Sequence, residues 1–301
     1  MILSVSRRTD VPAFFYYWFY NRINEGFVLV RNPMNNKQVS RILLNPEVID
    51  CIVFWSKNPK NLIVNLDKIK NYHYYFQFTL TPYDKTIEVN VPEKTVLIKT
   101  FIELSQRIGK ERVIWRYDPI MLTQKFTKEY HFNRFEYLAE KLHRYTKKCI
   151  ISFVDMYKKT ERNTATIDIM PMTDSVIFEI AEKLSIIAKK YGLSLETCSE
   201  AVDLSAFGIN HGKCIDDKLI SGIIGKPLFI EKDTNQRLSC GCVKSIDIGA
   251  YNTCKHNCLY CYANFSKSLV EKNCLQHNPD APLLYGALKG DEMIKDRGEY
   301  S

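Results

Sequence analysis

Short apolar segments alternate with longer amphipathic segments through the first two hundred residues, and this alternation constrains the fold more than any other feature. The apolar segments have the length and β-branched content of buried strands, and helical periodicity follows them. Strands that alternate with helices form a parallel sheet with right-handed crossovers. The predicted strands are residues 2–6, 48–55, 74–79, 112–116, 149–154 and 194–197, with a small extra strand at 27–30. The predicted helices are residues 12–24, 59–70, 92–108, 126–147 and 174–191.

This pattern predicts an α/β fold, specifically a (βα)6-type partial or complete TIM-like barrel formed by residues 1–200. An open doubly wound sheet is the alternative. Residues 201–264 contain glycines and cysteines but little helical periodicity, and we expect this cysteine-rich segment to cap the barrel mouth and to bind a cluster. Residues 265–301 are polar, and they predict one short helix and a weakly ordered tail.

Polar side chains follow the predicted strands where each strand ends. The carboxyl ends of parallel barrel strands form the working face of such a fold. A single polar strand end is explained by its exit into solvent, but the repetition at every strand favours a polar pocket. The residues concerned are Arg7, Arg8, Asp10, Lys57, Asn58, Thr81, Tyr83, Arg116, Asp118, Asp155, Tyr157, Glu196, Cys198 and Glu200.

Arg116 lies so close to a predicted buried strand that it needs an anionic partner. That partner is Asp118, another strand-end carboxylate, or the carboxylate of a bound ligand. Lys57 is a candidate for the same work, and simple salt bridges across the barrel mouth are the alternative for both residues.

Three cysteines near the C-terminal end have the spacing of a metal site. Cys254, Cys258 and Cys261 are separated by three and then two residues. Three thiolates on a tight loop can each bind a separate iron of a 4Fe–4S cluster, which leaves one iron open to a small molecule. A structural zinc site is the alternative, because similar spacings also suit zinc.

The other seven cysteines divide into three groups. Cys51 and Cys149 lie in predicted strands and are interpreted as core residues, and Cys274 is isolated. Four cysteines remain, which is the number for a second metal site: Cys198, Cys214, Cys240 and Cys242. A second 4Fe–4S cluster, a structural zinc ion and a redox-active Cys240/Cys242 pair are the possibilities.

The chain has no secretory signal at its start and no apolar run near the ~18 residues that span a bilayer. We therefore expect a cytoplasmic protein without a membrane partner, in which cysteines bind metals and do not form disulfides. The net charge of +8 is compatible with a nucleic-acid partner, but no aromatic and basic stripe demands one.

The Cys-x3-Cys-x2-Cys spacing, with Tyr260 directly before the last cysteine, resembles the motif of the radical S-adenosylmethionine (SAM) superfamily. The resemblance implies a 4Fe–4S cluster, SAM, and an electron donor such as flavodoxin or ferredoxin. It further implies reductive cleavage of SAM to a 5′-deoxyadenosyl radical that acts on a substrate the sequence does not identify. Under this hypothesis Asp155, Tyr157, Glu196 or Cys198 face the substrate. The residues expected at the cofactor are Lys57, Arg116, Asp118, Tyr260 and Asn264.

Two departures accompany this resemblance. The motif of the superfamily follows the first strand, whereas here it comes late, so we expect a permuted order in which a C-terminal lid carries the cluster. The Gly-Gly-Glu stretch that holds the amino group of SAM in many members is absent. His256, inside the motif, is expected to be exposed, and Asn252 and Asn264 are expected in turns.

The whole chain also resembles a family without an assigned reaction, whose C-terminal cysteines look like a radical SAM cluster motif. Four stretches carry this resemblance, beginning at Ser6 (SRRTD), Phe54 (FWSKNP), Trp115 (WRYDP) and Asp247 (DIGAYNTC). The alternative function is a zinc- or cluster-stabilised barrel that binds nucleic acid or a protein partner without radical chemistry.

Overall fold

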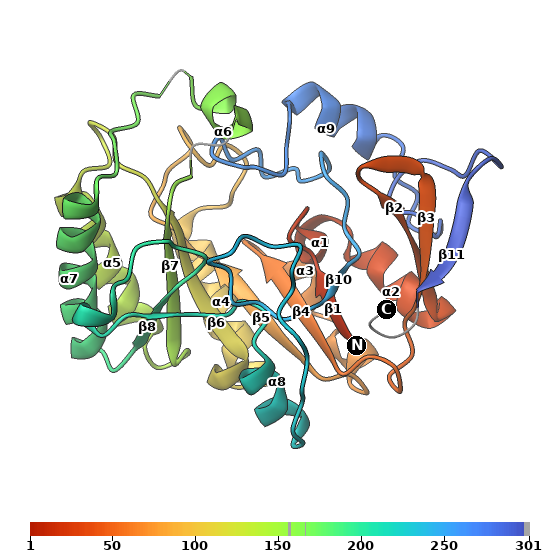
Figure 1. Ribbon diagram of the computed structural model, residues 1–301, viewed down its shortest axis with the longest axis horizontal. Coiled ribbons are helices and arrows are strands. Elements are labelled where there is room, and N and C mark those ends of the chain that lie inside the picture. The colour runs from red at the N-terminus through yellow and green to blue at the C-terminus, as the bar shows by residue number, and fades with distance from the viewer. Residues whose placement is uncertain (156–157, 166, 298–301) are drawn as a thin grey trace.

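The computed structural model describes residues 1–155, 158–165 and 167–297, and it is an α/β fold built on an eight-stranded sheet (Figure 1). Neighbouring strands of this sheet are parallel, in the order β10-β1-β4-β5-β6-β7-β8-β9. The strands are β1 (Ile2–Val5), β4 (Cys51–Ser56), β5 (Tyr74–Thr79), β6 (Val113–Ile120), β7 (Lys148–Phe153), β8 (Ser194–Thr197), β9 (Asn210–His211) and β10 (Ile246–Asp247).

The sequence prediction of a parallel α/β fold is confirmed, and all six principal strands form within a few residues of their predicted bounds. From β1 to β9 the spatial order follows the chain order, without the reversal of a doubly wound sheet. The sheet is open, because β9 and β10 are its edges and no pairing joins them in the described part of the chain. Barrel closure is therefore not found.

Helices cover the sheet and connect its strands. They are α1 (Val11–Phe14), α2 (Tyr16–Glu25), α3 (Lys60–Ile63), α4 (Lys94–Ile108), α5 (Lys128–Leu142), α6 (Lys158–Asn163), α7 (Asp174–Lys190), α8 (Asp217–Ile224) and α9 (Lys267–Cys274). The single helix predicted at 12–24 is divided at Phe15, which leaves helical geometry and is buried in the core. Gly109 ends α4, with a φ of 90° that favours glycine.

The two faces of the sheet bury different partners because side chains alternate along each strand. Phe54, Phe76 and Trp115 point to the outer face, where they pack in the main core with residues of α4, α5 and α7. Val53 and Ile150 point to the inner face, against a smaller cluster that includes residues of α8 and of the segment 212–243. The helix α8 was not predicted, since residues 201–264 have little helical periodicity.

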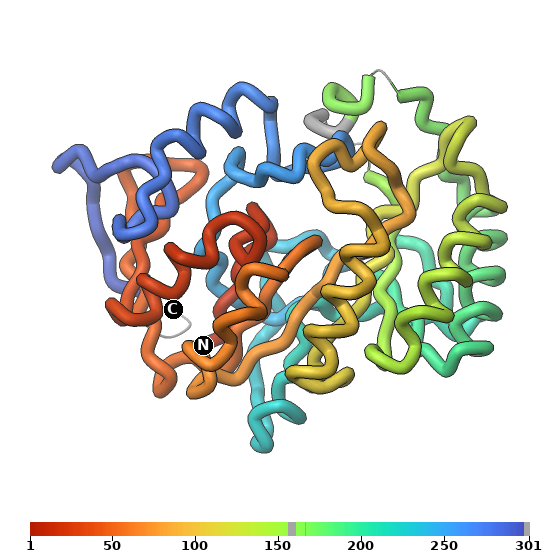
Figure 2. Tube along the Cα trace, turned by 180° about the vertical axis from the view of Figure 1, so that it is seen from behind, coloured from red at the N-terminus to blue at the C-terminus, as the bar shows by residue number. Residues whose placement is uncertain are grey.

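A second sheet contains β2 (Phe27–Asn32), β3 (Asn35–Leu43) and β11 (Met293–Arg297), in the order β11-β3-β2. The short helix expected after residue 265 is confirmed by α9, whereas the expectation of a weakly ordered tail is wrong for β11, which pairs with β3. Seen from behind, the C-terminal segment lies beside the N-terminal one (Figure 2). Trp18 contributes to this contact by donating its indole N–H to the carbonyl of Ala281 at 2.9 Å.

No helix in the described ranges is long and apolar enough to cross a membrane.

Candidate functional site

A cavity of about 830 Å³ lies where the central strands of the eight-stranded sheet end. It has the size of a cofactor or substrate site. Strand-end residues from β1, β4, β6, β7 and β8 line it, as the sequence predicts for a polar pocket. Both cysteine sets also line it: Cys198, Cys214, Cys240, Cys242, Cys254, Cys258 and Cys261. Sequence segments that are far apart therefore meet at one site, which we call the central cavity.

Asp10 ties the first two strand ends to the loop that contains the three-cysteine motif, residues 254–261. One carboxylate oxygen accepts hydrogen bonds from the backbone N–H of Ala13, at 3.0 Å, and from the hydroxyl of Ser56, at 2.7 Å. The other lies 2.7 Å from the backbone nitrogen of Lys57 and 2.8 Å from Nε2 of His256. His256 is only 3% exposed, so the expectation that it is solvent-exposed is wrong. A buried imidazole needs a partner, and Asp10 supplies it.

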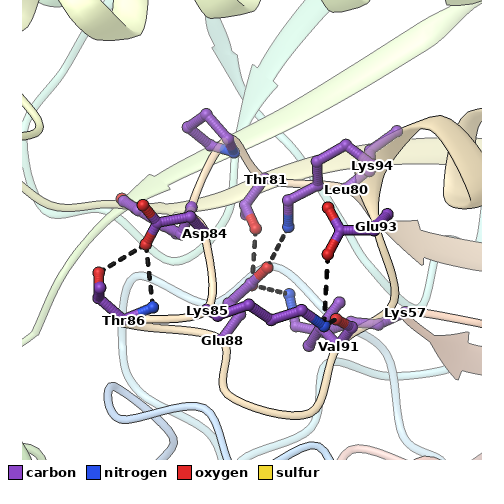
Figure 3. A network of polar contacts seen from close by, with 12 residues as sticks. Lys57, Leu80, Thr81, Asp84, Lys85, Thr86, Glu88, Val91, Glu93 and Lys94 are labelled. Carbon is purple, nitrogen blue, oxygen red and sulfur yellow. Dashed lines mark hydrogen bonds and ion pairs between the residues drawn. The ribbon is translucent and has the colours of Figure 1, made fainter.

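Glu88 is a second anchor of the same loop, and its carboxylate lies among the side chains of Lys57, Thr81 and Lys94 (Figure 3). Its carboxylate is 1% exposed and accepts hydrogen bonds from Lys57 Nζ and from the hydroxyl of Thr81, each at 2.7 Å. Lys94 and the hydroxyl of Tyr260 also donate to it. Burial alone would raise the pKa of Glu88, but Lys57 and Lys94 outweigh it and lower that pKa to about 2.

Backbone contacts extend this attachment. Glu88 and Cys258 form an isolated antiparallel bridge, and the N–H of Leu259 donates to the carbonyl of Ile87 at 3.0 Å. The N–H of Asn90 donates to the carbonyl of His256 at 3.0 Å. The segment 87–90 therefore braces the 254–261 loop along its length. Sequence reasoning named Thr81 and Tyr83 but missed Glu88, because a charged residue in a polar loop gives no signal of burial.

Asp247 is the last residue of β10 and the first residue of the DIGAYNTC stretch, and it connects β10 to the turn after β1. It accepts hydrogen bonds from the hydroxyls of Ser4, at 2.7 Å, and Ser6, at 2.6 Å. It also accepts the backbone N–H of Arg7 at 2.8 Å. Gly249 lies directly against this turn, where an added Cβ would come within 2.0 Å of the Ser6 hydroxyl. A glycine is required at that close approach.

Arg116 is buried at the wall of the central cavity and pairs with Asp118, one of the partners expected from the sequence. Its Nη1 also lies 2.6 Å from Sγ of Cys214, and its guanidinium stacks over the ring of Trp55 at 5.0 Å. Burial would raise the pKa of Asp118, but Arg116 and the hydroxyl of Ser152 lower it. Asp118 is therefore an anion in the folded protein.

Two of the residues predicted to face a substrate, Asp155 and Glu196, differ in their position relative to the central cavity. Asp155 lines the central cavity but is exposed, and it pairs with Arg237 at 2.6 Å. Glu196 does not line the cavity; it pairs with Lys148 at 2.8 Å. Tyr157 lies outside the described residues.

Tyr260 lines the cavity while its hydroxyl donates to the buried Glu88. Asn264 is buried and donates from its side-chain amide to the carbonyl of Cys254 at 2.8 Å. Asn252 has a φ of 59°, which fits the turn expected there. The three residues therefore have structural contacts that shape the 254–261 loop and its flanks.

The family comparison places these segments in one unit. The family model described as "Domain of unknown function (DUF1848)" matches residues 2–263. The chain belongs to this family. The match ends just after Cys261, so both cysteine sets of this DUF1848 protein lie within it, whereas α9 and β11 lie beyond it.

The other comparisons add little to the DUF1848 assignment. No curated protein matches the chain. Among solved structures, the chain is similar to one from Bacteroides thetaiotaomicron VPI-5482 described as "a putative alpha-L-fucosidase". The identity is 13%, the match covers 54% of this chain and 68% of that chain, and the TM-score is 0.24. A likeness this low carries no argument about fold or function.

The 254–261 loop of this DUF1848 protein fits a thiolate-bound cluster by its chemistry. Burial raises the pKa of the Cys254 and Cys258 thiols, and Lys57 beside Cys258 acts in the opposite direction. Buried thiolates are stable only beside positive charge, which a bound iron ion would provide. Within the described ranges, no three His, Cys, Asp or Glu side chains are already grouped as around one metal ion. A cluster with one thiolate on each of three irons does not require such a grouping.

Proposed function

We propose that this protein is an iron–sulfur enzyme of the radical SAM type, with its motif in a permuted position on a partial barrel. Cys254, Cys258 and Cys261 would hold a 4Fe–4S cluster at the central cavity. When bound and reduced by a donor such as flavodoxin or ferredoxin, the cluster supplies the electron that cleaves SAM to methionine and a 5′-deoxyadenosyl radical. The substrate of that radical is not identified by the residues of the cavity.

The single observation that carries the proposal is the position of the 254–261 loop. It lies over the strand ends, in one cavity with residues of the first, second and fourth predicted strands. Asp10 and Glu88 fix it from two sides through His256 and Tyr260. A late motif in the chain is thus compatible with the arrangement in which cluster and barrel mouth face each other.

Charge beside the loop supports the proposal as well. Lys57 and Lys94 share the single carboxylate of Glu88, which leaves one net positive charge next to Cys258. A cluster bound by three thiolates is anionic, and a buried positive charge stabilises it. This chain therefore contributes electrostatic stabilisation as well as sulfur ligands.

SAM would have to use different groups from those expected. Arg116 and Lys57 each have a protein carboxylate as a partner already, Asp118 and Glu88. The indole N–H of Trp55 and the hydroxyl of Thr9 are buried, line the cavity and have no hydrogen-bond partner within the described structure. They are the donors that this cavity offers to a polar ligand.

Anaerobic reconstitution tests the proposal. Protein purified without oxygen is loaded with iron and sulfide, and SAM and dithionite are then added. We expect iron with acid-labile sulfide, and 5′-deoxyadenosine detected by mass spectrometry. The triple variant Cys254→Ser/Cys258→Ser/Cys261→Ser should lose both, whereas the control Cys274→Ser should lose neither. A loaded wild-type protein that yields no SAM cleavage product would refute the radical SAM function.

A further inference from the structure

Two thiols from different segments of the chain meet at the wall of the central cavity. Cys198 follows β8 directly, and Cys214 precedes α8. Sγ of Cys198 lies 3.0 Å from Sγ of Cys214, and both residues line the cavity. A sulfur–sulfur bond is about 2.05 Å long, so the two sulfurs need to approach by only about 1 Å to form one.

The main sheet fixes the backbone of both cysteines. The N–H of Cys198 donates to the carbonyl of Ile151, in β7, at 2.9 Å. The carbonyl of Cys214 accepts the hydroxyl of Tyr75 at 2.6 Å and the side-chain amide of Gln77 at 2.9 Å, both from β5. The two sulfurs are therefore kept close together by the sheet, and side-chain rotation can supply the remaining approach.

The two sulfurs differ in exposure, and a cation lies beside them. Cys198 is half-buried, whereas Cys214 is 1% exposed. Nη1 of Arg116 lies 2.6 Å from Sγ of Cys214. The hydrogen bond with Cys214 lowers the pKa of Cys198 against the effect of burial, and Arg116 acts in the same direction. An accessible thiol with a lowered pKa is suited to attack a disulfide, and a buried neighbour is suited to resolve the product.

We propose that Cys198 and Cys214 form a redox-active dithiol, which becomes a disulfide by exchange with a low-molecular-weight disulfide in the central cavity. The Cys198 thiolate attacks one sulfur of that molecule, so that a mixed disulfide forms and a first thiolate leaves. Cys214 gives its proton to this thiolate, and its sulfur then attacks Sγ of Cys198 and releases a second thiolate. The dithiol loses two electrons, which reduce the small disulfide to one thiol and one thiolate.

The contact between the two sulfurs favours this bond over a second metal site. Structural zinc takes four ligands, and a 4Fe–4S cluster keeps its thiolates apart because each binds its own iron. Within the ranges described, no three His, Cys, Asp or Glu side chains are grouped as one metal ion requires. Cys198 and Cys214 meet as a pair. The proposed redox pair thus differs from the Cys240/Cys242 pair considered from the sequence.

Formation of the bond should also change the stability of the fold. A disulfide between Cys198 and Cys214 joins residues that are 16 positions apart in the sequence, and this link restricts the unfolded chain. The oxidised protein should therefore melt at least about 3 °C above the reduced protein. The dithiol does not depend on the radical SAM function, because neither cysteine belongs to the 254–261 loop.

Oxidised glutathione is the probe for the test, which uses the full-length protein. Reduced protein is incubated with the probe without oxygen, quenched in acid, alkylated and digested for mass spectrometry. We expect a peptide in which Cys198 is linked to Cys214, in the wild type and in the Cys254→Ser/Cys258→Ser/Cys261→Ser triple variant. In Cys214→Ser the mixed disulfide on Cys198 is not resolved, so it should accumulate at least about tenfold above its level in the control Cys274→Ser.

Peptide mapping of the wild type keeps the test decisive if Cys214→Ser fails to fold. A bond from Cys198 to Cys240 or Cys242, in place of Cys214, would overturn the proposal. Cys198 and Cys214 that both stay reduced in excess oxidised glutathione would overturn it too, as would zinc or iron that the triple variant retains and a further Cys198→Ser change removes. Loss of SAM cleavage in the triple variant, with the Cys198–Cys214 bond still formed, would separate this pair from the proposed cluster.

Discussion

Removal of the Glu88 charge should destabilise the protein more than any other single change to a carboxylate at the 254–261 loop. The pKa of Glu88 falls from 4.5 to about 2 on folding, although the carboxylate is buried. A shift of this size corresponds to roughly 3 kcal/mol of favourable interaction with Lys57 and Lys94. In Glu88→Gln both lysines lose their buried partner, and breaking a buried pair costs about 3–5 kcal/mol.

Thermal unfolding followed by circular dichroism checks this prediction. At about 2–4 °C per kcal/mol for a large domain, Glu88→Gln should melt at least about 6 °C below the wild type at pH 7. The matched control is Glu93→Gln, five residues along the chain. Glu93 is exposed, and its carboxylate lies 3.8 Å from Nζ of the exposed Lys85, so the melting temperature of Glu93→Gln should differ from the wild type by less than about 2 °C.

The pH dependence gives the same prediction a second readout. Because the folded pKa of Glu88 is depressed, its stabilisation is fully present above pH 4.5 and is lost as the pH falls toward 2. The gap between wild type and Glu88→Gln should therefore be widest above pH 4.5 and narrow in acid. A Glu88→Gln protein that melts within 1–2 °C of the wild type at pH 7 would refute the assignment of Glu88 as the buried anchor of the loop.

Three further changes have expected outcomes. Gly249→Ala should lower the urea midpoint by an amount equivalent to about 1–3 kcal/mol, because the added Cβ would lie 2.0 Å from the Ser6 hydroxyl oxygen. The control Gly222→Ala should not lower the midpoint, because a Cβ added there meets nothing within 4 Å. Asp10→Asn should reduce the iron content of reconstituted protein at least about twofold, because Asp10 accepts hydrogen bonds from α1, β4 and His256. The control Asp67→Asn should leave the iron content unchanged, and equal iron content in both variants would contradict a positioning role for Asp10. Burial raises the pKa of Glu200 to about 7, so the contribution of Glu200 to the free energy of unfolding should decrease between pH 4.5 and 7. The wild type should therefore lose stability relative to Glu200→Gln over this range, and parallel pH profiles would contradict that pKa.

The fold was accessible from the sequence where local pattern and tertiary environment agree. Apolar β-branched runs around Val53 and Ile150 predicted buried parallel strands, because both faces of those strands are covered. The helix α8 and the strand β11 were missed, since each is short and its stability comes from partners that are distant in the chain. Closure of the barrel could not be judged either, because it depends on how two short edge strands meet.

The sequence predicted which residues line the candidate site, but not the hydrogen bonds and ion pairs that hold them in place. The spacing of Cys254, Cys258 and Cys261 identified the loop, and the strand-end rule identified Lys57 and Arg116. The partner of Lys57 was not fixed by pattern, because Glu88 lies in a polar loop and is buried through its ion pairs with Lys57 and Lys94. His256 was misjudged for the same reason, as its burial depends on Asp10, at the other end of the chain.

The pairing of β10 with β1 sets an order for synthesis and maturation. Asp247 binds the hydroxyl of Ser4 across 243 residues of sequence, so the sheet gains this edge only when nearly the whole chain has left the ribosome. At 5–20 residues per second that delay is about 12–50 s, during which the first strand has one open side. The 254–261 loop follows directly, so its sulfurs reach the cavity only after the strands beneath them exist. Delivery of the proposed cluster would consequently follow synthesis of residues 246–261, because a nascent chain stalled before residue 246 presents a sheet without the 254–261 loop.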